Sequence, residues 1–219
     1  MTPDYDRAAT AAMQLLVDHA VTETPIAPFP FLMARPDVRV ISFAKMANEA
    51  NTERDELIPL FVANQDAATF RLGMDINGVK YVVVYNARLP FEIICRGIAR
   101  ELGHIVLGHD GVTRTKEVRR DEAMCFAHHL LSPRPILRML QEANALTMNT
   151  LSDTTGCIDE CVFDMRDIPG AHVPPELNRQ VRALFERGIK EYIRFHSASH
   201  HKDRSPLIDL GTFMDGYAE

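Results

Sequence analysis

The spacing of the hydrophobic residues changes several times in the first quarter of the chain. Apolar residues recur at helical spacing over residues 6–21, which predicts a first helix. Three prolines in residues 24–31 cannot continue that helix. Residues 38–43 then alternate between apolar and polar positions, as a half-buried strand does, and residues 44–57 predict a helix or a helical turn.

The next segment carries the clearest β pattern of the chain. Two extended runs, residues 68–75 and 79–86, flank the pair Asn77-Gly78. Asn-Gly is the preferred pair for a type I′ turn, because both central residues of that turn need a positive φ. The pattern therefore predicts an antiparallel β-hairpin.

Two helices are predicted to follow the hairpin. Pro90 fits the first turn of a helix over residues 90–108. A second helix covers residues 116–131, and Ser132-Pro133 ends it. The first of the two has an apolar stripe at helical spacing, which consists of Phe91, Ile94, Ile98, Leu102 and Ile105.

The last third of the chain is predicted to be helical. Residues 133–146 form one element, and residues 147–169 form two short helices joined at a turn. Residues 174–196 predict an amphipathic helix, whose apolar face consists of Val181, Leu184, Phe185, Ile189, Tyr192 and Ile193. Together these elements predict an α+β fold: a mostly helical body with a small antiparallel sheet packed against the helix over residues 90–108. We expect a first domain over residues 1–133 and a helical extension over residues 134–219, packed on the same core.

Charge and composition narrow the possible functions. The formal net charge of −6 disfavours a protein whose main task is binding nucleic acid, so no direct nucleic-acid binding is expected. The acidic N-terminus lacks the pattern of a signal peptide, and no apolar run approaches the roughly 20 residues that span a bilayer. The four cysteines form no CxxC pair. We therefore expect a cytoplasmic protein with reduced thiols and no membrane partner.

Candidate chemistry lies in the sequence IARELGHIVLGHDG, residues 98–111. Positions 100 and 104 differ by about 40° around a helix axis, so they point the same way. In the zinc motif H-E-x-x-H two histidines at this spacing bind one ion, and the Glu polarises a metal-bound water. This chain has Glu101 and His104, but Arg100 stands at the first histidine position.

A catalytic zinc needs a third ligand, and the second helix offers several. Glu122, Cys125 and His129 share one face of residues 116–131, and any of them could converge on His104 if the two helices pack antiparallel. Asp121 points away from that face and is a weaker candidate.

Both helices together resemble the ImmA/IrrE family of metallopeptidases. The resemblance rests on RGIARELGHIVLGH, followed by DEAMCFAHHLLSP, which is similar to the family pattern E-A-x-x-F-A-x-x-L-L-x-P. It implies that Glu101 is the general base, His104 a zinc ligand and Glu122 the acidic ligand. It also implies an intracellular regulatory protein that acts on a transcriptional repressor, including repressors of phages or other mobile elements.

Arg100 departs from the family pattern, and its chemistry leaves two outcomes. A guanidinium group has no lone pair for a metal and would repel a dication. The simplest outcome is that Arg100 forks onto Glu122 or Glu101 and fills the volume of the zinc. Otherwise His129, Cys125 or His109 replaces the missing ligand while Arg100 swings outward. Zinc is thus the expected cofactor if there is one, and the chain is a zinc peptidase, a binding module that does not cleave, or an accessory subunit.

Simpler roles are expected for the remaining candidate residues. His109 is expected to interact with the C-terminal end of its helix, and Cys125 to be a small buried residue. The pair His128 and His129 is expected to lie half at the surface and half at an interface. We expect packing roles for Cys157 and Cys161, and at most adventitious metal binding by His196 and His200. The segment around residues 152–166 is read as a structural helical part, not as a DNA-binding helix-turn-helix.

Overall fold

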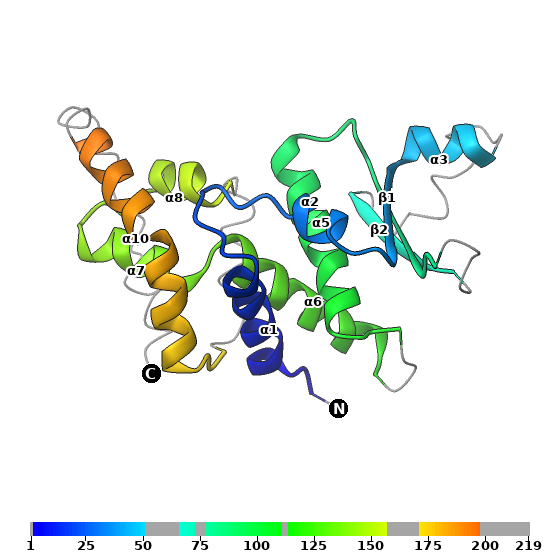
Figure 1. Cartoon of the computed structure of the whole chain (residues 1–219), viewed down its shortest axis with the longest axis horizontal. Helices are drawn as coiled ribbons and strands as arrows, with labels where there is room; N and C mark the ends of the chain where they lie inside the picture. The colour runs from blue at the N-terminus through cyan, green and yellow to red at the C-terminus, as the bar shows by residue number, and fades with distance from the viewer. Residues whose placement is uncertain (1, 51–65, 73–77, 111–113, 157–170, 198–219) are drawn as a thin grey trace. The chain divides into compact units, whose positions relative to one another are not determined.

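The computed structural model describes residues 2–50, 66–72, 78–110, 114–156 and 171–197 (Figure 1). The chain divides into two compact units. One consists of residues 27–127 with the first two residues, and the other of residues 3–26 and 128–219. The two units are considered separately below. The domain division expected near residue 133 stays a prediction.

The first unit contains a three-stranded sheet in its described part, with the order β1-β3-β2. The strands are β1 (Val38–Ser42), β2 (Ala67–Arg71) and β3 (Tyr81–Tyr85). Strands β2 and β3 pair antiparallel, which confirms the predicted hairpin strands. Gly78 has a φ of +77°, as the predicted turn requires, and Asn77 lies outside the described residues.

The sheet is mixed, not purely antiparallel as predicted. Strand β1 runs parallel to β3, with Val38 opposite Tyr81 and Ser42 opposite Tyr85. Parallel neighbours need a long connection, and the segment between β1 and β2 begins with helix α3 (Phe43–Ala50). The α+β class itself is confirmed.

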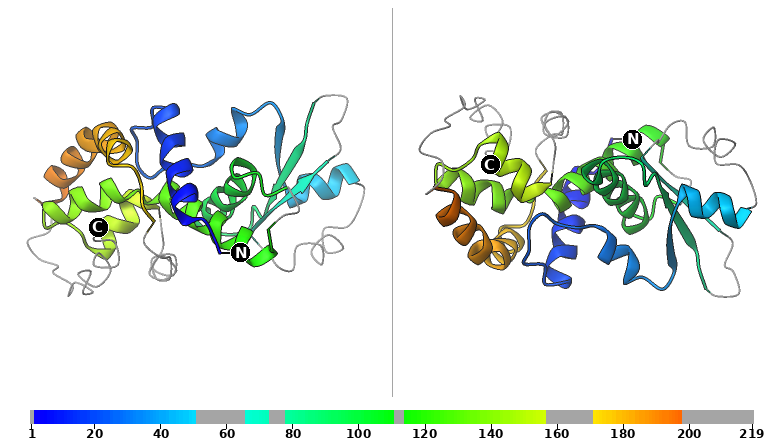
Figure 2. Two further views of the ribbon diagram at one scale, coloured as in Figure 1. Left: turned by 90° about the horizontal axis from the view of Figure 1, so that it is seen from below. Right: turned by 90° about the horizontal axis from the view of Figure 1, so that it is seen from above.

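Each face of the sheet is covered by a different helix. Val82 and Val84 belong to an apolar cluster that includes Phe43 and Ala47 of α3. Side chains alternate along a strand, so Tyr81 and Val83 point to the opposite face. Helix α5 (Phe91–Val106) packs against β2 and β3. Helix α2 (Phe29–Met33) contacts β1 and α5 (Figure 2).

The buried side of α5 follows the predicted stripe with one exception. Ile94, Ile98, Leu102 and Ile105 are buried, as expected. Phe91 is 59% exposed, so its place in the stripe was wrong. It is the first residue of the helix and lies at the end of the stripe.

Helix α6 (Lys116–Leu131) approaches α5 at a glycine. A Cβ atom on Gly103 would lie 3.0 Å from Cδ1 of Phe126 and 3.1 Å from the carbonyl oxygen of Ala123. The absence of a side chain at Gly103 thus allows the two helices that carry the candidate site to come close. The last turn of α6 belongs to the second unit.

The second unit is built from helices in its described part: α1 (Tyr5–Asp18), α7 (Arg134–Glu142), α8 (Met148–Thr155) and α10 (Pro175–Ser197). Helix α10 contacts both α7 and α1. Val181, Phe185 and Ile189 form the buried centre of its predicted apolar face. None of the helices in the described ranges has the length and hydropathy that crossing a bilayer requires.

Candidate functional site

The C-terminal end of α5 places two histidines side by side. Leu107 ends the helix, and Gly108 has a φ of +65°, which a glycine adopts without steric cost. The backbone N–H of Gly108 donates to the carbonyl of Ile105 (3.2 Å), and that of His109 donates to the carbonyl of His104 (2.9 Å). These two bonds form a Schellman motif, which turns the chain back on the last helical turn and brings His109 beside His104.

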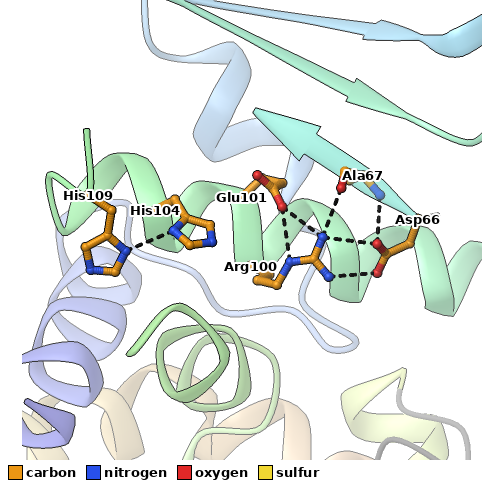
Figure 3. A network of polar contacts seen from close by, with 6 residues as sticks. All are labelled: Asp66, Ala67, Arg100, Glu101, His104 and His109. Carbon is orange, nitrogen blue, oxygen red and sulfur yellow. Dashed lines mark hydrogen bonds and ion pairs between the residues drawn. The ribbon is translucent and has the colours of Figure 1, made fainter. Parts of the chain in front are cut away.

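Arg100 lies in a buried network one turn earlier on α5 (Figure 3). Its Nη1 and Nη2 donate to the two carboxylate oxygens of Asp66 at 3.1 and 3.0 Å, which is a bidentate pair. Nη2 also donates to the carbonyl of Ala67 (2.9 Å). Nε and Nη2 donate to Oε1 of Glu101 at 3.1 and 2.8 Å. The guanidinium group therefore joins the start of β2 to α5.

The exposed fractions of the three charged residues of this network are all small. They are 8% for Arg100, 7% for Asp66 and 3% for Glu101. Burial opposes the charge of Arg100, but Glu101 and Asp66 outweigh it and raise the pKa of the guanidinium. Burial raises the pKa of Glu101, against the opposing effect of Arg100. One cation thus faces two carboxylates. The raised pKa of Glu101 favours its neutral form, which would leave Arg100 and Asp66 as a balanced pair of charges.

A glycine makes room for the carboxylate of Asp66. A Cβ atom on Gly97 would lie 2.9 Å from Cγ and 3.0 Å from Oδ2 of Asp66, which is closer than real Cβ contacts come. The backbone N–H of Ala67 donates to Oδ1 of Asp66 (2.8 Å). Asp66 is therefore held on three sides, by Gly97, Ala67 and Arg100.

A second polar chain links α5 to α6. Nδ1 of His104 and Nδ1 of His109 are 2.9 Å apart, and Nε2 of His109 is 2.9 Å from Oε2 of Glu122. Arg114 donates to Oε1 of Glu122, and Arg119 donates to the carbonyl of His109 (3.0 Å). Nε2 of His109 donates to Glu122 when that carboxylate is ionised, and one of the two Nδ1 atoms donates to the other.

The surroundings of His104 keep it neutral. Burial, together with the nearby His109 and Arg100, lowers the pKa of His104 to about 3. A neutral imidazole keeps a nitrogen lone pair that can bind a metal or accept a hydrogen bond, but the lowered pKa makes His104 a poor proton acceptor near neutral pH. The positions of its neighbours decide what it can bind.

The sequence of this chain matches the model of a known protein family. The model for Peptidase_M78, described as the IrrE N-terminal-like domain, matches residues 36–156, which is more than half of the chain. The chain belongs to this family. No curated protein and no solved structure matches it. The family assignment confirms the resemblance seen in the sequence and supports a metallopeptidase-like regulatory role.

The family is generally zinc-dependent, but the residues present here do not fit a zinc ion. Arg100, which the resemblance in the sequence places at the first ligand position, is fixed by two carboxylates. His104 and Glu122 contact opposite nitrogens of the His109 ring, so the three do not point at one common centre. Within the described ranges, no group of three or more His, Cys, Asp or Glu side chains is arranged to hold a metal.

The other sequence-based predictions for this region have mixed outcomes. Arg100 forks onto Glu101, as one expected option had it, but its second carboxylate is Asp66 and not Glu122. The ring of His109 contacts two side chains, so the expected role at the helix end is carried by its backbone N–H instead. Cys125 is buried, as expected.

For the remaining candidates the structure gives only a position. His128 and His129 are both buried, at 8% and 4% exposure, so the expectation that half of this pair lies at the surface was wrong. His129 belongs to the second unit, and its role as a metal ligand stays a prediction, like those of His104 and Glu122. His196 lies on α10 with its ring 4.1 Å from that of Tyr192. Cys157, Cys161 and His200 lie outside the described residues.

Two residues of the site were missed in the sequence. Asp66 precedes the predicted strand by two residues, and Arg114 lies in the loop before α6. A buried arginine needs an opposite charge nearby, so Arg100 itself was a signal that an acidic residue from a neighbouring element lies beside it. Periodicity could not say which acid, because Asp66 is 34 residues away from Arg100 in the chain.

Proposed function

We propose that this protein is a regulatory member of the IrrE N-terminal-like family that binds a protein partner without cleaving it. The observation that carries the proposal is the buried pairing of Arg100 with Asp66 and Glu101. A permanently protonated group in the first ligand position neither coordinates zinc nor tolerates a dication beside it. This favours the binding module among the three mechanisms that the sequence left open.

The state of Glu101 supports the same conclusion. A general base of the H-E-x-x-H type must reach a metal-bound water and accept its proton. Here Oε1 of Glu101 accepts two hydrogen bonds from Arg100, and burial raises the pKa of this carboxyl. Glu101 thus has a structural partner in place of a catalytic one.

We further propose that the partner is a transcriptional repressor, of a phage or another mobile element, met in the cytoplasm. The net charge of −6 disfavours direct contact with DNA, so an effect on transcription would pass through a partner that itself binds DNA. A protein that occupies a repressor can inactivate it by binding alone. Cleavage is not needed when the bound repressor cannot reach its operator.

A zinc peptidase with a substitute ligand is the competing function. The observation in its favour is that His109 lies 2.9 Å from both His104 and Glu122. Rotation of the His109 ring, with Arg100 swung outward, would be needed to gather three ligands. That change would leave Asp66 without its cation in a buried position, which costs several kcal/mol.

Metal content decides between the two functions. Protein purified without chelators should contain far less than one zinc per chain. Arg100→His, which restores the family motif, should raise the zinc content towards one per chain, and Arg100→Gln is the matched control that supplies no imidazole. Near-stoichiometric zinc in the native protein, lost on His104→Ala, would refute the proposal.

A cleavage assay completes the test. The native protein should retain a repressor encoded beside it on an affinity column and leave that repressor intact after long incubation with added zinc. Repressor fragments that appear with the native protein and disappear with Glu101→Gln would establish the competing function.

A further inference from the structure

The cation of Arg100 is held by two elements that are distant in sequence. Asp66 lies at the start of β2, and Glu101 lies on α5. Four of the five guanidinium N–H groups of Arg100 are used, on Asp66, on Glu101 and on the carbonyl of Ala67. Figure 3 shows the guanidinium plane lying between the two carboxylates.

This arrangement is specific to a guanidinium ion. The two carboxylate oxygens of Asp66 meet two different nitrogens of Arg100, at 3.1 and 3.0 Å, which is the fork geometry that an ammonium group cannot reproduce. Gly97 and the N–H of Ala67 keep Asp66 in place for this contact. Asp66, Ala67 and Glu101 thus form a fixed set of acceptors for one planar cation.

We propose that Arg100 is a built-in cation and Asp66 the positioning residue that seats it, so that the guanidinium group joins β2 to α5 without any divalent ion. The proposal rests on the proposed function, because it explains how a family member holds β2 against α5 without zinc. It goes further in assigning a guanidinium site whose specificity lies in Asp66. Binding of a partner by this protein would then be insensitive to zinc and to chelators.

Chemical rescue tests the guanidinium site. Arg100→Ala removes the cation and leaves its acceptors, so dissolved guanidinium ion can take its place. The thermal midpoint of unfolding is measured with guanidinium chloride at about 50 mM, far below its denaturing concentrations of several molar. Sodium chloride at the same concentration controls for ionic strength.

Arg182→Ala is the matched control variant. Arg182 also makes a bidentate pair, with Glu142 at 2.9 and 2.6 Å, but its side chain is 39% exposed and that of Glu142 is 57% exposed. Exposed pairs contribute little, so Arg182→Ala should keep the native midpoint and show no rescue. Arg100→Ala should lower the midpoint by about 10 °C, because breaking a buried pair is far more costly.

Rescue is the decisive result. Guanidinium at ten times its dissociation constant should raise the midpoint of Arg100→Ala by about 3 to 6 °C, in a saturable manner. The rise should vanish in Arg100→Ala/Asp66→Asn, which lacks the seating carboxylate. An equal response of the single and double variants, or none in either, would overturn the proposal.

Two further measurements keep the test decisive. If Arg100→Ala does not fold, Arg100→Lys replaces it, because lysine keeps the charge but cannot form the two-pronged contact with Asp66. The change Asp66→Asn should then destabilise Arg100→Lys less than it destabilises the native protein. Equal destabilisation would count against the pairing. The native midpoint is also measured with zinc and with a chelator, and a zinc-dependent rise would refute the proposed function, whereas failed rescue refutes only the guanidinium site.

Discussion

Replacing Gly97 by alanine should destabilise the protein, although the same change usually stabilises a helix. Gly97 is an interior residue of α5, where alanine is intrinsically better than glycine by about 1 kcal/mol. The new Cβ atom would lie 2.9 Å from Cγ, 3.0 Å from Oδ2 and 3.1 Å from Cβ of Asp66. Asp66 cannot retreat without stretching its two bonds to Arg100.

The expected size follows from these two opposing effects. Complete loss of a buried ion pair costs about 3–5 kcal/mol, and a displaced Asp66 loses a large part of it. After subtraction of the helix-propensity gain, Gly97→Ala should lower the free energy of unfolding by about 1–3 kcal/mol. Urea unfolding followed by far-UV circular dichroism measures this change.

Gly188→Ala is the matched control for the helix-propensity gain. Gly188 is also interior to a helix, α10, and the nearest atom to its new Cβ would be the carbonyl oxygen of Thr22 at an ordinary 3.6 Å. This variant should be more stable than the native protein by up to about 1 kcal/mol. In an Asp66→Gly background, which lacks the Cβ, Cγ and Oδ2 atoms alike, the cost of Gly97→Ala should disappear. A Gly97→Ala protein as stable as Gly188→Ala would refute the close packing of Asp66.

Three further changes test other contacts of the first unit. The folded pKa of His104 is about 3, below its ordinary 6.5, so the unfolded chain takes up the proton first and acid should destabilise the fold between these values. The free energy of unfolding should fall by at most about 1.4 kcal/mol per pH unit, and this fall should be absent from His104→Gln. Parallel profiles of unfolding free energy against pH for the two proteins would contradict the prediction. Gly103→Ala should cost about 1–3 kcal/mol in urea unfolding, because its Cβ would meet Phe126 at 3.0 Å, and a neutral result would show that α6 can shift. Tyr81→Phe removes a 2.8 Å hydrogen bond to Asp110 and should lower the thermal midpoint by an amount equivalent to about 1 kcal/mol, whereas an unchanged midpoint would show that Asp110 keeps its other partners at no cost.

Comparison with the sequence-based predictions shows which features were locally encoded. The helix that carries the motif was placed within a residue or two of its ends, because its apolar stripe and Gly108 act through neighbouring residues. The antiparallel hairpin strands followed from alternation in the same way. The direction of β1 did not, since alternation is identical in parallel and antiparallel strands.

The chemical identity of the site residues was likewise readable from the chain alone. That Arg100 cannot coordinate a metal follows from the absence of a lone pair on its guanidinium group, whatever the fold. The partners of Arg100 and His104 were decided only by the tertiary structure. Asp66 reaches Arg100 because β2 packs on α5, and His109 lies between His104 and Glu122 because α5 ends in a tight turn beside α6. Periodicity reports which face of an element is buried, but hydrogen bonds between buried charges depend on packing distances that no local pattern contains.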